Sequence, residues 1–279
     1  MSMDSLVSMQ NVDKNFRDMA VFHQLNISLQ KGKTVMIGPN GTGKSTFLKI
    51  CYGISSIQSG KASVMGYDTF SERNDLKRKV AYLPAEAVFP PGLTVESILD
   101  YVSTFCSANR IDQLASGLDA ASLKRKVTRT LSSGERQIVN LIWVLSQERQ
   151  FYLLDEPTAS LDRDRRRQFI DILRETHESV LVTSHEYNEL FGAVDFICQL
   201  HRITGSGQSV FSPVLKARET VVKVMFFDEQ KAVNHLKNIN AHFSIDGDFI
   251  TIYSELSEAI SGLAGDIVLM QRDIDNEPH

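Results

Sequence analysis

Cysteine is scarce in this chain of 279 residues, which contains only Cys51, Cys106 and Cys198. The three residues lie far apart in the sequence and form no Cys-x-x-Cys pair. Disulfide-stabilised secreted domains and structural zinc sites place their cysteines in even numbers or in close pairs. The sequence therefore excludes both classes and is typical of a protein from a reducing compartment such as the cytosol.

Long apolar runs are also absent. The most apolar stretches, residues 138–145 and 180–182, are far shorter than the roughly 20 residues that cross a bilayer. The chain does not begin with a basic segment followed by an apolar block, so no secretory signal is expected. We therefore expect no direct membrane span, and any role at a membrane must come through a partner.

An excess of positive charge is missing too. The formal net charge is -4 and the isoelectric point is about 6.0, whereas proteins that bind duplex nucleic acid carry a basic footprint. The short basic runs at residues 77–79 and 124–126 are interpreted as solvated surface. No nucleic-acid partner is predicted.

What the sequence does contain is a regular alternation of strands and helices. Apolar runs of strand length at residues 34–37, 80–83, 151–154 and 180–183 alternate with longer segments of helical period. This order predicts an α/β fold with a mostly parallel sheet. Between the second and third runs lies a helical insertion, about residues 93–148, with Ile98, Val102 and Phe105 at helical spacing.

The pattern changes after residue 200, where a Gly/Ser-rich stretch precedes a second unit. The order in this unit is βαββαβ, which predicts a small ferredoxin-like α+β domain at residues 219–279. Its expected strands are 221–227, 241–245, 249–253 and 267–270, and its expected helices are 229–238 and 256–263.

A phosphate-binding loop is the strongest motif in the chain. The stretch GPNGTGKS, residues 38–45, fits G-x-x-x-x-G-K-[ST] and lies between a predicted strand and a helix expected at 46–53. Backbone amides of such a loop surround the β-phosphate, Lys44 reaches the β- and γ-oxygens, and the Ser45 hydroxyl binds Mg²⁺. The loop predicts ATP and Mg²⁺ as ligands. The predicted ATP-binding residues are Gly38, Pro39, Asn40, Gly41, Thr42, Gly43, Lys44, Ser45 and Thr46.

Two carboxylates follow the third predicted strand in FYLLDEP, residues 151–157. Side chains at the carboxyl ends of parallel strands meet the ligand in α/β folds. Asp155 is placed to hold the metal, and Glu156 to orient or deprotonate the attacking water. By itself, Asp-Glu-Pro could equally end a strand at a turn. The upstream phosphate loop favours the catalytic interpretation.

Taken together, GPNGTGKST, LSSGE, LLDEPTASLD and TSH resemble the motifs of the ATP-binding cassette (ABC) ATPases in both order and spacing. The resemblance covers about residues 3–200. It implies a P-loop NTPase cassette at residues 1–205, which carries the helical insertion, with ATPase activity. His185 in TSH resembles the switch histidine that positions the attacking water. Phe16 occupies the place of the aromatic residue that stacks on adenine, although a core phenylalanine is the alternative.

The stretch LSSGE resembles the family signature, which binds the γ-phosphate of ATP held by the other subunit of a head-to-tail dimer. This implies an ATP-induced homodimer. The residues implied to contact ATP across the dimer are Ser132, Ser133, Gly134, Glu135 and Asp162.

Two departures from the family pattern are visible. Ala85 stands where relatives usually have glutamine, and it cannot ligate metal or hydrogen-bond water. Either the neighbouring Glu86 takes over, or the link between the nucleotide and the membrane partner is looser. Ser133 replaces the usual first glycine of the signature, and serine remains compatible with a helix start.

The expected function is that of the ATP-hydrolysing subunit of a membrane transporter, located in the cytoplasm at the inner face of the membrane through a separate transmembrane permease subunit. The insertion resembles cassettes of the drug, peptide and lantibiotic exporters, so export is the leading interpretation. An importer ATPase with a regulatory C-terminal domain is the alternative, and a cassette ATPase of DNA repair or the ribosome is a further one.

Overall fold

In a computed structural model, the chain folds into two compact units, residues 1–214 and 215–279. The residues that the structure describes are 5–17, 19–185, 190, 193–202, 209–211, 215–216, 222–226, 229–238, 243–246, 249–252 and 267–272. Among them, no helix is long and apolar enough to cross a membrane.

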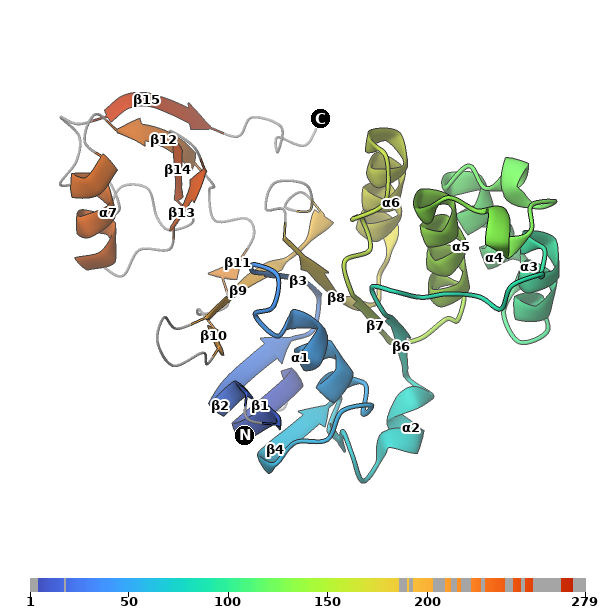
Figure 1. The fold of residues 1–279 in the computed structure, drawn as a ribbon, viewed down its shortest axis with the longest axis horizontal. Helices are drawn as coiled ribbons and strands as arrows, with labels where there is room; N and C mark the ends of the chain where they lie inside the picture. The colour runs from blue at the N-terminus through green and yellow to red at the C-terminus, as the bar shows by residue number, and fades with distance from the viewer. Residues whose placement is uncertain are drawn as a thin grey trace. The chain divides into compact units, whose positions relative to one another are not determined.

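The centre of the first unit is a parallel sheet (Figure 1). Its strands, in sheet order, are β9 (Phe196–Arg202), β3 (Lys33–Ile37), β8 (Ser179–Ser184), β7 (Phe151–Leu154) and β6 (Val80–Leu83). The four predicted strands correspond to β3, β6, β7 and β8, within one residue at each end. All four residues of β7 are buried, as expected for a strand covered on both faces. The α/β class and the parallel sheet are thus confirmed.

A mostly antiparallel part that the sequence analysis did not predict continues the same sheet beyond β9. Its strands, in sheet order, are β5 (Tyr67–Asp68), β4 (Ser59–Val64), β1 (Ser5–Phe16), β2 (Met19–Gln30) and β10 (Ser209–Phe211). The register of β1 on β2 shifts at several points, and Asn11 and Gln24 adopt positive φ angles of 49° and 47°. These irregularities break the period-two pattern by which a strand is recognised in a sequence.

The helices of the first unit lie in two groups. Helix α1 (Lys44–Cys51) follows β3 and buries Phe47, Leu48 and Ile50 in the core shared with β1, β2 and β7. It begins two residues earlier than predicted. The short α2 (Arg73–Lys77) precedes β6, and α6 (Arg163–Glu175) follows β7.

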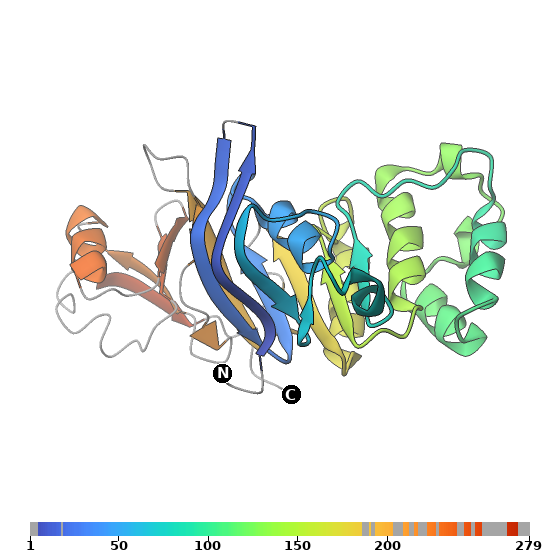
Figure 2. The ribbon, with the colours of Figure 1, turned by 90° about the horizontal axis from the view of Figure 1, so that it is seen from below.

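The predicted helical insertion is helical in the structure and lies at the β6 edge of the sheet (Figures 1 and 2). It comprises α3 (Val95–Ser103), α4 (Ala108–Gly117), the 3-10 turns η1 (Ala121–Leu123) and η2 (Thr128–Thr130), and α5 (Ser133–Leu145). Ile98 and Val102 lie on α3 and are buried. Phe105 lies beyond the end of α3 at Ser103, and its side chain is 55% exposed.

The second unit contains a four-stranded antiparallel sheet. Its described elements are β11 (Leu215–Lys216), β12 (Val222–Phe226), α7 (Glu229–Asn238), β13 (Phe243–Asp246), β14 (Phe249–Ile252) and β15 (Ile267–Arg272). The sheet order is β13-β14-β12-β15. The helix expected at residues 256–263 lies outside the described residues. The assignment of residues 219–279 as a separate ferredoxin-like domain therefore stays a prediction.

Candidate functional site

The phosphate loop joins β3 to α1 and turns sharply into the helix. Gly43 adopts a φ angle of 100°, and a Cβ atom there would lie 2.8 Å from Cγ1 of Val21, so only glycine fits. Lys44 follows and is 5% exposed. Its Nζ donates hydrogen bonds to the carbonyl oxygens of Gly38, at 2.6 Å, and Pro39, at 3.4 Å. The ammonium group is therefore held against the start of the phosphate loop by these two carbonyl groups.

Three predicted residues from distant parts of the chain meet at this ammonium group. Lys44 Nζ lies 3.2 Å from Glu156 Oε1, and Glu156 Oε2 lies 2.8 Å from Nδ1 of His185. Glu156 Oε1 accepts no hydrogen bond from the described residues, so its contact with Lys44 Nζ is an ion pair only. Glu156 has a φ angle of 49°, unusual for a residue with a side chain. The arrangement puts a carboxylate between a phosphate-binding cation and an imidazole.

Asp155 directly follows β7 and is 1% exposed. Thr183 Oγ1 donates to Asp155 Oδ1 at 2.7 Å and accepts a hydrogen bond from the backbone N–H of Glu156 at 2.9 Å. Burial, followed by the negative charge of Asp155, raises the pKa of the neighbouring Tyr82. Thr183 thus orients the Asp155 carboxylate and holds the backbone of Glu156. The sequence analysis did not assign it a role, although it begins the TSH stretch.

The donor groups at this point suit Mg²⁺. This ion takes few protein ligands, usually one or two side-chain oxygens, and completes its shell with water and substrate phosphates. Ser45 lines the cavity described below and Asp155 lies at the adjoining strand end. Among the described residues, no group of three or more His, Cys, Asp or Glu side chains could hold a metal. Ser45 and Asp155 are thus the candidate ligands, and Mg²⁺ bound there would neutralise phosphate charge.

A cavity of about 540 Å³, which is large enough for a nucleotide, lies beside the phosphate loop, Glu156 and His185. The predicted residues that line it are Phe16, Asn40, Gly41, Gly43, Lys44, Ser45, Thr46, Glu156 and His185. Gly38, Pro39 and Thr42 instead form hydrogen bonds inside the loop, where Thr42 Oγ1 donates to the carbonyl of Pro39 at 2.8 Å. Most of the predicted ATP-binding and catalytic residues therefore lie around one cavity.

Several lining residues were missed from the sequence. They are Met19, Val21, Gln137, Ala159 and Ser160. Met19 and Val21 belong to β2, which was not predicted. Gln137 follows the signature on α5, and its Nε2 donates to the carbonyl of Pro157 at 3.0 Å. Its position two residues after Glu135 was the only available signal. Ala85 and Glu86 also line the cavity, so the question of which one matters stays open.

Phe16 closes β1 at the edge of the cavity. Its side chain is 46% exposed, so the alternative of a core phenylalanine is wrong. An aromatic ring that is half accessible and lines a nucleotide-sized cavity is suited to stack on a base. Its contact with adenine stays a prediction.

The signature residues begin α5 and form a complete helix cap. Ser132 Oγ accepts from the backbone N–H of Glu135 at 3.2 Å, and Glu135 Oε2 accepts from the N–H of Ser132 at 3.0 Å. Lys126 Nζ lies 2.7 Å from Glu135 Oε1. The hydrogen bond from Lys126, and then that from Ser132, lowers the pKa of Glu135. This capping box fixes the start of the helix.

None of the five residues predicted to act across a dimer lines the cavity of its own chain, as far as the structure describes it. Asp162 caps α6 by accepting from the N–H of Arg165 at 3.0 Å. Gly134 lies against the backbone of Ser160, because a Cβ atom there would be 2.6 Å from the Ser160 carbonyl oxygen. The role of these residues toward a second subunit stays a prediction.

The cap predicts the effect of a small change. Ser132→Ala removes the acceptor for the Glu135 N–H and is expected to lower the free energy of unfolding by about 0.5–2 kcal/mol. The neighbouring Ser133 is exposed and caps nothing, so Ser133→Ala is the matched control, expected to change it by less than about 0.5 kcal/mol. Urea denaturation followed by circular dichroism measures both. Equal losses would contradict the capping role.

Comparison with known proteins identifies this architecture. The family model described as "ABC transporter" matches residues 22–159. The Petrobactin import ATP-binding protein FatE of Bacillus anthracis is 31% identical over 209 residues, which cover 70% of this chain and 84% of that protein. The Zinc import ATP-binding protein ZnuC of Photorhabdus laumondii is 30% identical over 213 residues, covering 74% and 79% respectively. The chain belongs to the ABC transporter family.

The predicted family and the predicted ATPase activity, with ATP as substrate and Mg²⁺ as metal, are thus confirmed for this ABC ATPase. A solved structure of a dimeric bacterial ABC transporter cassette superimposes with a TM-score of 0.65 at 19% identity, covering 76% of this chain and 99% of that one. At this identity the likeness shows the fold alone, and the predicted cassette fold is confirmed.

Proposed function

We propose that this ABC ATPase hydrolyses ATP to drive a separate transmembrane permease, from a position at the cytoplasmic face of the membrane. The observation that supports the catalytic part is the chain of contacts Lys44–Glu156–His185 at the wall of a nucleotide-sized cavity. A phosphate-binding cation and a general base therefore lie within reach of the same γ-phosphate. The direct test is the rate of phosphate release from ATP by the purified chain and by its Glu156 variant.

Each residue contributes a distinct step in this proposal. Amides of the loop and Lys44 bind the phosphate oxygens, which draws Lys44 away from Glu156 because the phosphate charge is larger. Glu156 then orients a water molecule toward the γ-phosphate and accepts its proton. His185 holds the Glu156 carboxylate through Nδ1. Phe16, which also lines the cavity, stacks on adenine.

The second part of the proposal is a head-to-tail homodimer formed on ATP. A helix start of this kind, with a positive dipole end and backbone donors, stabilises an anion. The start of α5 does not line its own cavity, so the phosphate that it would contact belongs to a second copy. Ser132, Ser133, Gly134, Glu135 and Asp162 are assigned to this contact. ATP then joins the two subunits, and hydrolysis releases them.

The third part concerns the permease surface. Four rings, which we call the aromatic patch, gather at the helical insertion: Tyr101, Phe105 and Trp143 within it, and Phe89 just before it. Ring centroids of Phe89, Tyr101 and Phe105 lie 5.7, 6.0 and 6.3 Å from that of Trp143. Tyr101 is 60% exposed. Clustered exposed apolar groups mark interaction sites, and a cytoplasmic segment of the permease with an apolar face fits this one.

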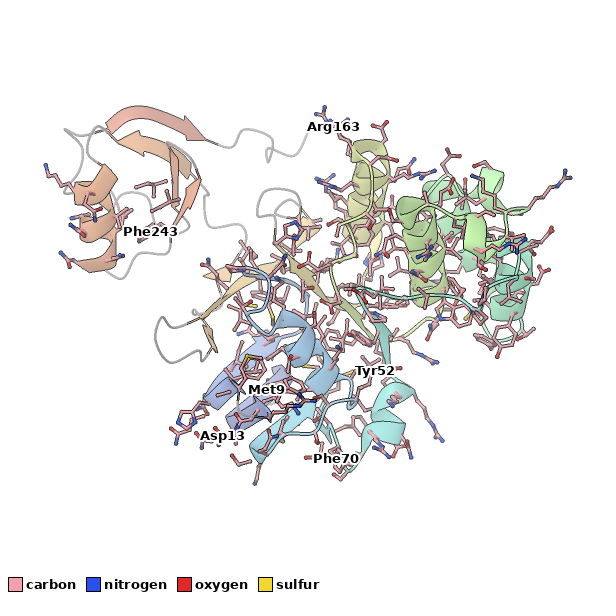
Figure 3. The ribbon with its side chains drawn as sticks, in the orientation of Figure 1. Met9, Asp13, Tyr52, Phe70, Arg163 and Phe243 are labelled. Atoms are coloured by element: carbon pink, nitrogen blue, oxygen red, sulfur yellow. The ribbon has the colours of Figure 1, made fainter. Side chains whose placement is uncertain are left out.

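The aromatic patch predicts a selective loss of partner binding. Tyr101→Ser combined with Phe105→Ser is expected to reduce co-purification with the permease encoded by a neighbouring reading frame at least about tenfold, because aromatic anchors dominate interfaces. Basal ATP hydrolysis should be unchanged. Phe70→Ser is the matched control, since Phe70 is equally exposed but lies near α2, away from α3–α5 (Figure 3). Equal loss in the control variant would exclude the patch as the docking site.

The direction of transport has two candidates. The sequence of the insertion favours export, while the two curated relatives are named as import proteins. Inside-out vesicles that contain the permease and this ABC ATPase separate the two candidates. ATP-driven accumulation of substrate inside such vesicles indicates export, and the absence of accumulation there together with uptake in right-side-out vesicles indicates import.

A further inference from the structure

Lys14 is an unusual residue in β1. Its side chain is only 5% exposed, although lysine is among the residues least often buried. Its Nζ donates a hydrogen bond to the carbonyl oxygen of Ser56 at 2.6 Å. Burial lowers the pKa of the Lys14 ammonium group. A hydrogen bond to one carbonyl oxygen does not by itself explain why this ammonium group is buried.

The aromatic ring of Phe16, two residues further along β1, offers an explanation. Lys14 Nζ lies 4.6 Å from the centroid of the Phe16 ring. A cation at this distance is attracted to the negative face of the ring. The Phe16 side chain is 46% exposed and also lines the nucleotide cavity. The ring therefore has the ammonium group within cation–π distance and a large accessible surface at the cavity.

We propose that Lys14 is a positioning residue for nucleotide binding, which holds the Phe16 ring in the orientation that stacks on the base. This inference rests on the proposed contact between Phe16 and adenine. Phe16 is the last residue of β1, and its side chain is 46% exposed. Lys14, anchored at Ser56, supplies an attraction that selects one ring orientation before the nucleotide arrives. Preorganised contacts of this kind lower the cost of binding.

A structural role for Lys14 is the competing explanation, because the bond to Ser56 ties β1 to the segment after α1. The two explanations differ in their dependence on Phe16. A tie between segments acts whether or not the ring is present. A positioning residue acts only through the ring. The test must therefore compare the same Lys14 change in the presence and absence of Phe16.

The experiment measures ADP affinity of the full chain by calorimetry, because ADP is not turned over. Lys14→Gln removes the charge but keeps a donor for the Ser56 carbonyl. It is expected to weaken ADP binding about 2- to 30-fold, the range of a cation–π contact. In the Phe16→Ala background, the same change is expected to have no further effect. Lys14→Arg keeps a cation over the ring and should retain the wild-type affinity within about twofold.

Each outcome either supports or overturns the positioning role of Lys14. Equal losses for Lys14→Gln with and without Phe16 would show a structural tie and overturn the proposal, as would unchanged affinity in the single variant. If Phe16→Ala alone leaves ADP binding intact, the stacking role of Phe16 has failed, which is distinct from a failure of Lys14 alone. Lys14→Met, which removes both the charge and the donor, gives the same comparison if Lys14→Gln does not fold.

Discussion

Glu156→Gln is expected to reduce ATP hydrolysis about 10²- to 10⁴-fold, the usual contribution of a general base. Glutamine keeps the size of the side chain and can still contact His185, which lies 2.8 Å from Oε2 in the native chain. It cannot accept the proton of the attacking water. ATP binding should not weaken, since the change also removes the carboxylate that lies 3.2 Å from Lys44 Nζ and leaves that cation to the phosphates.

Phosphate release at saturating ATP measures the rate, and calorimetry measures the affinity. Glu148→Gln is the matched control, because Glu148 has nearly the same φ angle of 50° but follows α5 and does not line the cavity. The control is expected to retain the native rate. Hydrolysis by Glu156→Gln near the native rate would remove Glu156 from its catalytic assignment.

Ser133→Asp, made in the Glu156→Gln background, is expected to abolish the ATP-induced dimer. The aspartate adds a negative charge where the phosphate of the partner would bind, and like charges about 4 Å apart repel by about 4 kcal/mol at an effective dielectric constant near 20. Ser133 is the right position because it is exposed, and because an acid in the first turn stabilises a helix. Gly134 is unsuitable, since any side chain there meets the carbonyl of Ser160.

Size-exclusion chromatography with ATP compares three chains at equal concentration. Glu156→Gln alone should elute as a dimer, and the Ser133→Asp double variant as a monomer whose own nucleotide site is filled. Ser133→Asn in the same background is the control, because it has the shape of aspartate without its charge, and it should remain dimeric. A dimer of undiminished strength with Ser133→Asp would mean that the start of α5 is only a capped helix.

The sequence predicted the parallel sheet closely because its strands are short, continuous apolar runs. β7, for example, is buried along its whole length, so no alternation is needed to recognise it. The long antiparallel pair β1–β2 was missed because its register shifts and its positive φ angles at Asn11 and Gln24 disturb the pattern. Phe105 was placed in the same helical run as Ile98 and Val102 because no local signal marks the end of α3 at Ser103.

In the site, too, some residues were predictable from the sequence and others were not. Lys44, Glu156 and His185 each belong to a motif of fixed spacing, so they could be assigned to one site from the sequence alone. Met19 and Gln137 were missed because they reach the cavity only through tertiary packing, one from β2 and the other from α5. Thr183 was missed because a threonine that bonds the Asp155 carboxylate and the Glu156 backbone looks, in the sequence, like any β-branched residue of a strand.

The close approach of Gly134 to Ser160 has a mechanical meaning. The carbonyl oxygen of Ser160 lies 2.6 Å from the position that a Cβ atom on Gly134 would take, and Ser160 itself lines the nucleotide cavity. The rim of the cavity and the start of α5 are therefore in direct backbone contact, with no Gly134 side chain between them. A displacement of the rim toward the helix start would meet backbone rather than a side chain that could change its rotamer.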